Sequence, residues 1–159
     1  MRGAFFFLAG ILVGIMAMQT GEAQSNGIVA LNHVGIGVGN MEEALNFYTR
    51  TLGFREAFAV RDQNGRPTLI NIQINRDSFI ELQPVAAGQQ PGLTHIGLQV
   101  GNIQAAVVRL RQLNLKVEDI RVGRTRGPLS NTTDADGIRV ELLELTPESL
   151  QRKAMDSWR

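Results

Sequence analysis

The sequence predicts an α+β protein built from two tandem modules, each with the element order βαβββ. The segment 31–40, L-N-H-V-G-I-G-V-G-N, recurs at 93–102 as L-T-H-I-G-L-Q-V-G-N, with six of ten positions identical. Within each copy the hydropathy pattern predicts a strand, then a helix and three further strands. The repeat is longer than the units of solenoid proteins, so it indicates a duplicated module whose two copies pack as a pseudo-symmetric pair.

Length and composition limit the classes of protein that this chain can belong to. The 159 residues suffice for one domain with a substantial core. The net charge of +1 gives no overall field that would favour nucleic acid, so we expect no nucleic-acid partner. The chain has no cysteine, which excludes disulfides, thiolate metal sites and a cysteine nucleophile.

Residues 1–23 have the pattern of a signal peptide. The apolar run at 4–18 is 15 residues long, shorter than the roughly 20 residues of a bilayer span. The segment Gly21-Glu22-Ala23 is a small-x-small pattern that a signal peptidase cleaves after the last residue. We therefore expect an exported protein, periplasmic or extracellular, with no stable membrane insertion after cleavage. An uncleaved membrane anchor is the alternative.

Residues 24–30 are predicted to be a linker, and residues 31–84 the first module. Asn40 is expected to cap the helix of this module and Gly53 to end it. Asn64-Gly65 is a hairpin signal between the second and third strands. The expected strands are 31–38, 55–61, 68–74 and 78–83.

The second module spans 93–146, after a linker that ends at Pro91. Asn102 is expected to cap its helix, and the D-A-D-G segment at 134–137 is a turn signal. A helical tail at 147–159 follows, whose helix is expected to start at Thr146-Pro147-Glu148. Beyond the repeated segment, the expected strands are 115–120, 130–133 and 138–145.

The duplication gives meaning to the two histidines of the chain. His33 and His95 occupy the same position of the repeat. The fourth strands also match, because F-I-E-L in module one aligns with R-V-E-L in module two and places Glu81 against Glu141. A lone carboxylate is costly to bury between apolar residues of a strand, so both acids require a reason for their position.

Side-chain alternation predicts that these four residues project from one open face of the sheet. Two imidazoles and two carboxylates that converge in a cleft form a ligand set for a divalent first-row metal. Inherited symmetry without a metal is the alternative.

Arg139 is expected on the face opposite to Glu141. The residues of the first strand expected on the helix-covered face are Val34, Ile36 and Val38. Those expected beside His33, where the two glycines would leave room above the metal, are Leu31, Gly35 and Gly37.

Over residues 31–146 the chain resembles the vicinal oxygen chelate superfamily, which includes glyoxalase I, methylmalonyl-CoA epimerase, extradiol dioxygenases, fosfomycin-resistance proteins and bleomycin-resistance proteins. The resemblance rests on H-V-G-I-x-V from His33, E-E-A-L-N-F-Y-T-R-T-L-G-F at 42–54, T-H-I-G-L at 94–98 and D-A-D-G-I-R-V-E-L at 134–142. The family often has D-P-D-G-N before its last glutamate, and Ala135 and Ile138 depart from that pattern.

The resemblance implies a cupped, barrel-like mixed sheet, the glyoxalase fold, with one divalent metal ion inside it. Ni, Zn, Co, Mn and Fe are the candidate metals. The implied ligands are His33, Glu81, His95 and Glu141. Two positions of a hexacoordinate metal would stay open for vicinal oxygens of a small-molecule substrate. Members of this family often dimerise, so a homodimer is expected.

The four-ligand set most resembles glyoxalase I, so the sequence predicts a metal-dependent lyase or isomerase that moves a proton next to a carbonyl. Glu141 and Glu81 are the candidate bases. By alternation, Asn71, Gln73 and Gln99 are expected to line the open face. Two loop residues, Arg124 and Arg126, are candidate contacts for an anionic substrate.

Three alternatives stay open. One is a binding or resistance protein that sequesters a ligand in the same cleft. The second is an epimerase, whose chemistry is also α-proton transfer. The third is an extradiol dioxygenase, although Glu81 would fill a position that oxygen chemistry leaves open. Gly37 stands where relatives of glyoxalase I often have an arginine, which counts against a glutathione adduct as substrate.

Overall fold

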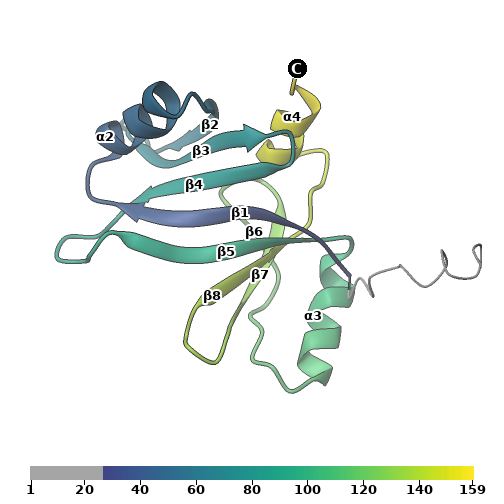
Figure 1. The fold of residues 1–159 in the computed structure, drawn as a ribbon. Helices are drawn as coiled ribbons and strands as arrows, with labels where there is room; N and C mark the ends of the chain where they lie inside the picture. Colours follow the sequence, from purple (N-terminus) through teal and green to yellow (C-terminus); the bar gives the residue numbers. More distant parts are fainter. Residues whose placement is uncertain (1–26) are drawn as a thin grey trace, which may run out of the picture.

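The computed structural model describes residues 27–159, in which eight strands form one curled, mixed sheet with helices at its surface (Figure 1). The strand order is β2-β3-β4-β1-β5-β8-β7-β6. This arrangement confirms the predicted α+β class, with βαβββ repeated twice. The predicted signal peptide lies outside the described residues. No helix within 27–159 is long and apolar enough to cross a membrane.

The two modules contain corresponding elements. The first consists of β1 (Ile28–Val38), α2 (Met41–Asn46), the π-helix η2 (Phe47–Thr51), β2 (Arg55–Arg61), β3 (Pro67–Asn75) and β4 (Ser78–Pro84). The second consists of β5 (Gly92–Val100), α3 (Ile103–Gln112), β6 (Arg121–Val122), β7 (Pro128–Thr133) and β8 (Arg139–Leu143). The helix α4 (Leu150–Asp156) follows.

The modules join through their first strands, at the centre of the sheet. β1 and β5 pair antiparallel, and each also pairs in parallel with the last strand of its own module, β4 or β8. The β1–β5 register sets His33 opposite Gly97 and Gly35 opposite His95. The repeated segment therefore brings both histidines to the junction of the modules.

Each module buries its apolar residues between its sheet and its own helix. In module one the buried Ile72 and Leu82 pack with Met41 and Leu45 of α2, and in module two Leu142 packs within the cluster that α3 supplies. The predicted caps are confirmed, because Asn40 accepts the N–H groups of residues 42 and 43, and Asn102 accepts that of residue 105. The opposite face of the sheet stays available for the site.

The predicted strand at 115–120 is wrong, and β6 contains two residues only. Glu118 N–H does donate to the Asn131 carbonyl, as a strand would. However, the carbonyls of this segment are taken by side chains: Ser130 donates to the Glu118 carbonyl, Thr132 to that of Lys116, and Arg111 to that of Val117. These side chains replace the backbone ladder.

Other predicted boundaries also shift. β1 begins at Ile28, within the predicted linker. The first helix changes from α to π geometry at Phe47, and Gly53 follows it with a φ of 75°. The tail helix does not start at Thr146-Pro147-Glu148, because the side chain of Ser149 accepts the Arg152 N–H and α4 begins at residue 150.

The helix α4, at the C-terminal end of the chain, lies against module one (Figure 1). Its Ala154 and Met155 are buried against Phe79 of β4. Phe79 and Glu81 are two residues apart on β4 and therefore share a face of the sheet. The helix α4 thus covers part of the inner face from which the glutamate projects. Part of the open face of module one is thereby closed.

Candidate functional site

The four predicted metal ligands come together at the centre of the sheet. His33 of β1 and His95 of β5 face each other, with their Nε2 atoms 2.9 Å apart. Glu81 of β4 lies 3.7 Å from His95 Nε2, and Glu141 of β8 lies 3.7 Å from His33 Nε2. Both imidazoles are fully shielded from solvent, whereas the side chain of Glu141 is 13% exposed.

The glycines of the repeated segment make room for the imidazoles themselves. A Cβ at Gly35 would overlap the ring of His95, and one at Gly97 would overlap the ring of His33. Each histidine thus lies over the glycine opposite it in the β1–β5 register. The expectation that Gly35 and Gly37 leave open space above a metal is wrong, because Gly37 faces Val85.

Burial keeps both imidazoles neutral. Desolvation lowers the pKa of His33, and desolvation together with the neighbouring His33, Arg139 and Arg124 lowers the pKa of His95 to about 3. Asn32 Oδ1 lies 3.0 Å from His33 Nδ1 and cannot donate, so the hydrogen of this ring is on Nδ1. The Nε2 lone pair of His33 accepts the hydrogen bond from His95 Nε2 at 2.9 Å, and a neutral imidazole nitrogen of this kind can ligate a metal in place of that contact.

Glu81 is held by two side-chain amides. Asn71 Nδ2 donates to Oε2 at 3.3 Å, and Gln83 Nε2 donates to Oε1 at 2.6 Å. Gln83 is held in turn by Arg124, which donates to its Oε1 at 2.8 Å. These contacts fix the orientation of the carboxylate before any ligand binds.

Glu141 has a different environment from its counterpart. Within residues 27–159 its carboxylate accepts no side-chain hydrogen bond. Asn131, which lies opposite it in the β7–β8 register, donates to Glu118 instead, at 2.7 Å. Burial, with a further contribution from the negative charge of Glu81, raises the pKa of Glu141 to about 7. Without a metal ion beside it, this carboxylate exchanges its proton near neutral pH.

The residues present fit a divalent metal ion. One potential ligand atom from each of His33, Glu81 and His95 lies within 4.8 Å of the other two. Two neutral imidazoles and carboxylate oxygens are ligands that first-row divalent metals accept. Hydrogen bonds from Asn71 and Gln83 orient one of these carboxylates, as outer partners do in metal sites.

A small polar cavity of about 70 Å³ opens beside the two glutamates. Arg121, Arg124 and Arg139 all line it. The prediction that Arg139 faces away from Glu141 is wrong, because residues two apart on a strand share a face. Arg139 is paired with His95 in the β5–β8 register, and its guanidinium donates to His95 Nδ1 at 2.8 Å.

Of the other residues predicted to contact the substrate, only some lie at a cavity. Asn71 contacts Glu81, and Gln73 is fully buried, where it donates to the Arg76 carbonyl and accepts from Arg55. Gln99 lines neither the small cavity nor the larger one described below. Both loop arginines are exposed, and of the two only Arg124 lines the small cavity.

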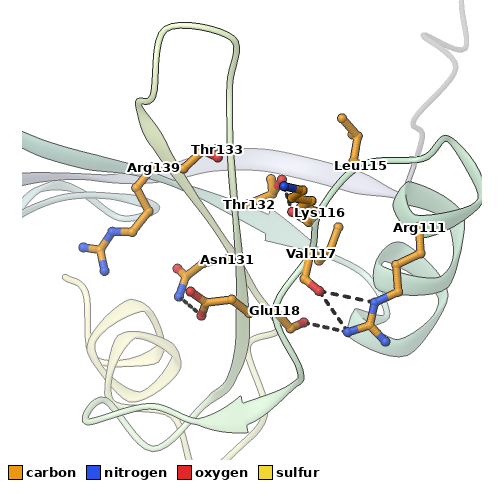
Figure 2. Close-up of a pocket in the computed structure, with 9 residues that line it drawn as sticks. All are labelled: Arg111, Leu115, Lys116, Val117, Glu118, Asn131, Thr132, Thr133 and Arg139. Atoms are coloured by element: carbon orange, nitrogen blue, oxygen red, sulfur yellow. Dashed lines mark hydrogen bonds between the residues drawn. The ribbon is translucent and has the colours of Figure 1, made fainter.

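A larger cavity of about 590 Å³ lies in module two, between β7 and the segment that follows α3 (Figure 2). Leu115 and Val117 contribute to its wall, and Arg139 also lines it. Figure 2 shows the guanidinium of Arg139 pointing away from these two apolar residues. Arg139 therefore stands between the larger cavity and the small one.

Comparison with known families places the chain. Residues 30–142 match the model of the Glyoxalase/Bleomycin resistance protein/Dioxygenase superfamily. The chain belongs to this superfamily, which confirms the resemblance to vicinal oxygen chelate proteins predicted from the sequence.

Within this superfamily, the chain is similar to individual proteins of known activity. The chain is 32% identical over 129 residues to human mitochondrial methylmalonyl-CoA epimerase, a match that covers 70% of this chain and 72% of the human protein. The crystal structure of methylmalonyl-CoA epimerase from Mycobacterium tuberculosis is similar in fold, with a TM-score of 0.68, 20% identity and coverage of 80% and 95% of the two chains. A halotolerant catechol dioxygenase also shares the fold, at a TM-score of 0.58, 23% identity and coverage of 73% and 40%.

Proposed function

We propose that this protein is a metal-dependent isomerase that moves a proton next to the carbonyl of a small substrate, in the manner of an epimerase. Two of its similar proteins, human and bovine, are methylmalonyl-CoA epimerases, which supports this reaction type over the lyase reaction predicted first. Methylmalonyl-CoA is accordingly the first substrate to test.

The unequal surroundings of the two glutamates carry the proposal. Glu81 is held by two amides, which suits a permanent metal ligand. Glu141 has no such partner among the described residues, which leaves its carboxylate free to take and return a proton. We therefore assign Glu81 as the anchoring ligand and Glu141 as the base.

The residues of the site then have separate tasks. His33, His95, Glu81 and Glu141 would hold the metal ion, which supplies Lewis-acid stabilisation of the negative charge that develops at a bound carbonyl. Glu141 removes the α proton, and inversion of configuration also requires that a proton returns to the opposite face of the planar intermediate. The buried imidazoles stay neutral and leave proton transfer to the carboxylate.

Proton exchange with solvent tests this function directly. Methylmalonyl-CoA is incubated in D₂O with the protein loaded with Ni²⁺, Zn²⁺, Co²⁺ or Mn²⁺, and α-deuteration is followed by mass spectrometry. We expect exchange with at least one metal, none after chelation, and a loss of about 10²–10⁴-fold in Glu141→Gln. Glu148→Gln, which changes an exposed glutamate, is the matched control. Exchange that persists in Glu141→Gln would exclude Glu141 as the base.

A glyoxalase I-like lyase is the second candidate, because the two-histidine, two-glutamate set serves the same proton transfer. Methylglyoxal with several thiols, assayed on the same metal-loaded samples, separates the two reactions. Metal binding without either activity would instead favour the ligand-sequestering alternative.

We also propose export and dimerisation, on the sequence pattern of residues 1–23 and the habit of the family. Mass spectrometry of the protein from its native host is expected to find Gln24 at the N-terminus. Light scattering of the purified protein is expected to give the mass of two chains. An intact Met1 in a membrane fraction would contradict the first expectation, and a monomer the second.

A further inference from the structure

We propose that the small cavity beside Glu141 is an anion subsite, in which Arg124 and Arg139 bind a carboxylate of the substrate. The proposal rests on the proposed function for the place where the substrate reacts, but the binding itself requires no turnover. Neither residue belongs to the metal-ligand set, and only Arg124 was predicted from the sequence.

The charge of the site favours an anion. Glu81 and Glu141 line the cavity together with Arg121, Arg124 and Arg139. A divalent cation at the ligand set would balance the two carboxylates, which leaves three guanidinium charges without a counterion in a confined polar space. Such an excess of one sign of charge in a cavity attracts a ligand of the opposite sign.

Arg124 is held in position by both modules. It comes from the loop of module two, and its guanidinium donates to the Thr68 carbonyl at 3.0 Å and to Gln83 at 2.8 Å, both in module one. These contacts restrict the long side chain before a ligand arrives, so less rotamer entropy is lost on binding. The guanidinium has further N–H donors that these two bonds do not use.

Arg139 is poised to change partners. Its guanidinium donates to His95 Nδ1, and Thr94 Oγ1 lies 2.9 Å from the same nitrogen. A metal ion on Nε2 of His95 requires the ring hydrogen on Nδ1, and a guanidinium cannot accept that hydrogen whereas the Thr94 hydroxyl can. A metal ion on Nε2 would therefore remove this acceptor from Arg139, whose side chain already lines the cavity.

The size of the cavity and the type of donor indicate the ligand. A space of about 70 Å³ admits only a short polar group. The planar fork of a guanidinium matches the two oxygens of a carboxylate, and such charge-assisted contacts are about twice as strong as neutral ones. A carboxylate attached close to the reacting carbon satisfies both conditions.

The test compares malonate with malonamate, in which one carboxylate is replaced by an amide of nearly the same shape. A carboxylate is also the stronger metal ligand, so the ratio of the two dissociation constants in the wild type is compared with the ratio in each arginine variant, which isolates the contribution of the guanidinium. Isothermal titration calorimetry on the metal-loaded protein is expected to show malonate binding about tenfold tighter or more. The ratio should fall below the wild-type ratio in Arg124→Gln and in Arg139→Gln.

Arg126→Gln is the matched control, because this exposed arginine lies two residues from Arg124 and outside the cavity. We expect it to keep the wild-type ratio. Equal binding of the two compounds by the wild type, or an unchanged ratio in both cavity variants, would overturn the subsite. Malonate discrimination without α-proton exchange would instead contradict the proposed function and leave the subsite standing.

Discussion

The two modules supply the same ligands from matching positions, yet they surround them differently. In module one Gln83 follows Glu81 on the same face of β4, and Asn71 donates to the glutamate from β3. In module two the residue corresponding to Gln83 is Leu143, and the corresponding asparagine turns to Glu118. Duplication accounts for the shared metal ligands, and divergence of their neighbours separates an anchored carboxylate from a free one.

A second difference lies two residues before each glutamate. Module one has Phe79, which packs against Met155 of α4, whereas module two has Arg139, which lines both cavities. The apolar side chain allows the terminal helix to close one half of the inner face. The charged side chain keeps the other half open to a ligand. Module one therefore has part of its inner face closed, whereas module two keeps part of its inner face open.

The largest expected difference between the modules concerns their glutamates. Glu81→Gln would present an amide NH₂ to the amides of Asn71 and Gln83, one of which would lose its acceptor. We expect a loss of about 1–3 kcal/mol in unfolding free energy, and metal affinity weakened by at least about 100-fold.

Glu141→Gln removes a charge that burial disfavours, so the metal-free protein should stay within about 0.5 kcal/mol of wild type or gain stability. Denaturant titration and metal calorimetry check both; equal effects would contradict the assignment.

The junction of the modules gives the next prediction. Gly35→Ala and Gly97→Ala each force the opposite imidazole to move. We expect metal affinity to fall by about 100-fold and stability by about 1–3 kcal/mol, because a ligand and a packed contact are both displaced. Gly39→Ala is the control, since a Cβ there meets only Pro91 at an ordinary 3.6 Å. Wild-type affinity in Gly35→Ala and Gly97→Ala would show that the rings do not depend on these glycines.

The closure of module one by α4 can be tested separately. Met155→Ala removes a buried side chain from the contact with Phe79, so we expect a loss of about 2 kcal/mol in unfolding free energy. Lys153→Ala changes an exposed residue of the same helix and should stay within about 0.5 kcal/mol of wild type. Chemical denaturation gives both values, and equal values would mean that α4 adds little to module one.

The smallest effect is expected when Gln83 of module one is replaced by leucine, the residue at the corresponding position of module two. Gln83→Leu removes one amide from Glu81 and one partner from Arg124. Loss of such an outer partner should weaken metal binding by about tenfold while the fold is kept. Metal calorimetry checks the affinity, with a thermal melt to confirm folding. Unchanged affinity would mean that Asn71 alone is sufficient to orient the carboxylate.

The repeat made most of the fold predictable from the sequence. Alternation along β1, β4, β5 and β8 placed His33, Glu81, His95 and Glu141 on one face, and the capping asparagines located both helices. The segment 115–120 was not predictable, because its strand is replaced by side-chain hydrogen bonds from residues distant in the sequence.

The finer features of the site depend on partners across strands, which a single sequence does not display. The role of Gly35 follows from its register against His95, and that register is known only once β1 and β5 are paired. The contact of Arg139 with His95 arises in the same way, from the pairing of β5 with β8. Alternation alone would have placed Arg139 on the same face as Glu141, so the prediction of the opposite face was an error in applying it.

The metal content of the protein tests the central claim most directly. The full-length protein is loaded with Ni²⁺, Zn²⁺, Co²⁺, Mn²⁺ or Fe²⁺, dialysed, and measured by elemental analysis with a thermal melt of the same sample. The convergence of His33, Glu81, His95 and Glu141 predicts one ion per chain for at least one of these metals, together with a higher melting temperature. No stoichiometric metal, and an unchanged melting temperature with all five, would contradict it.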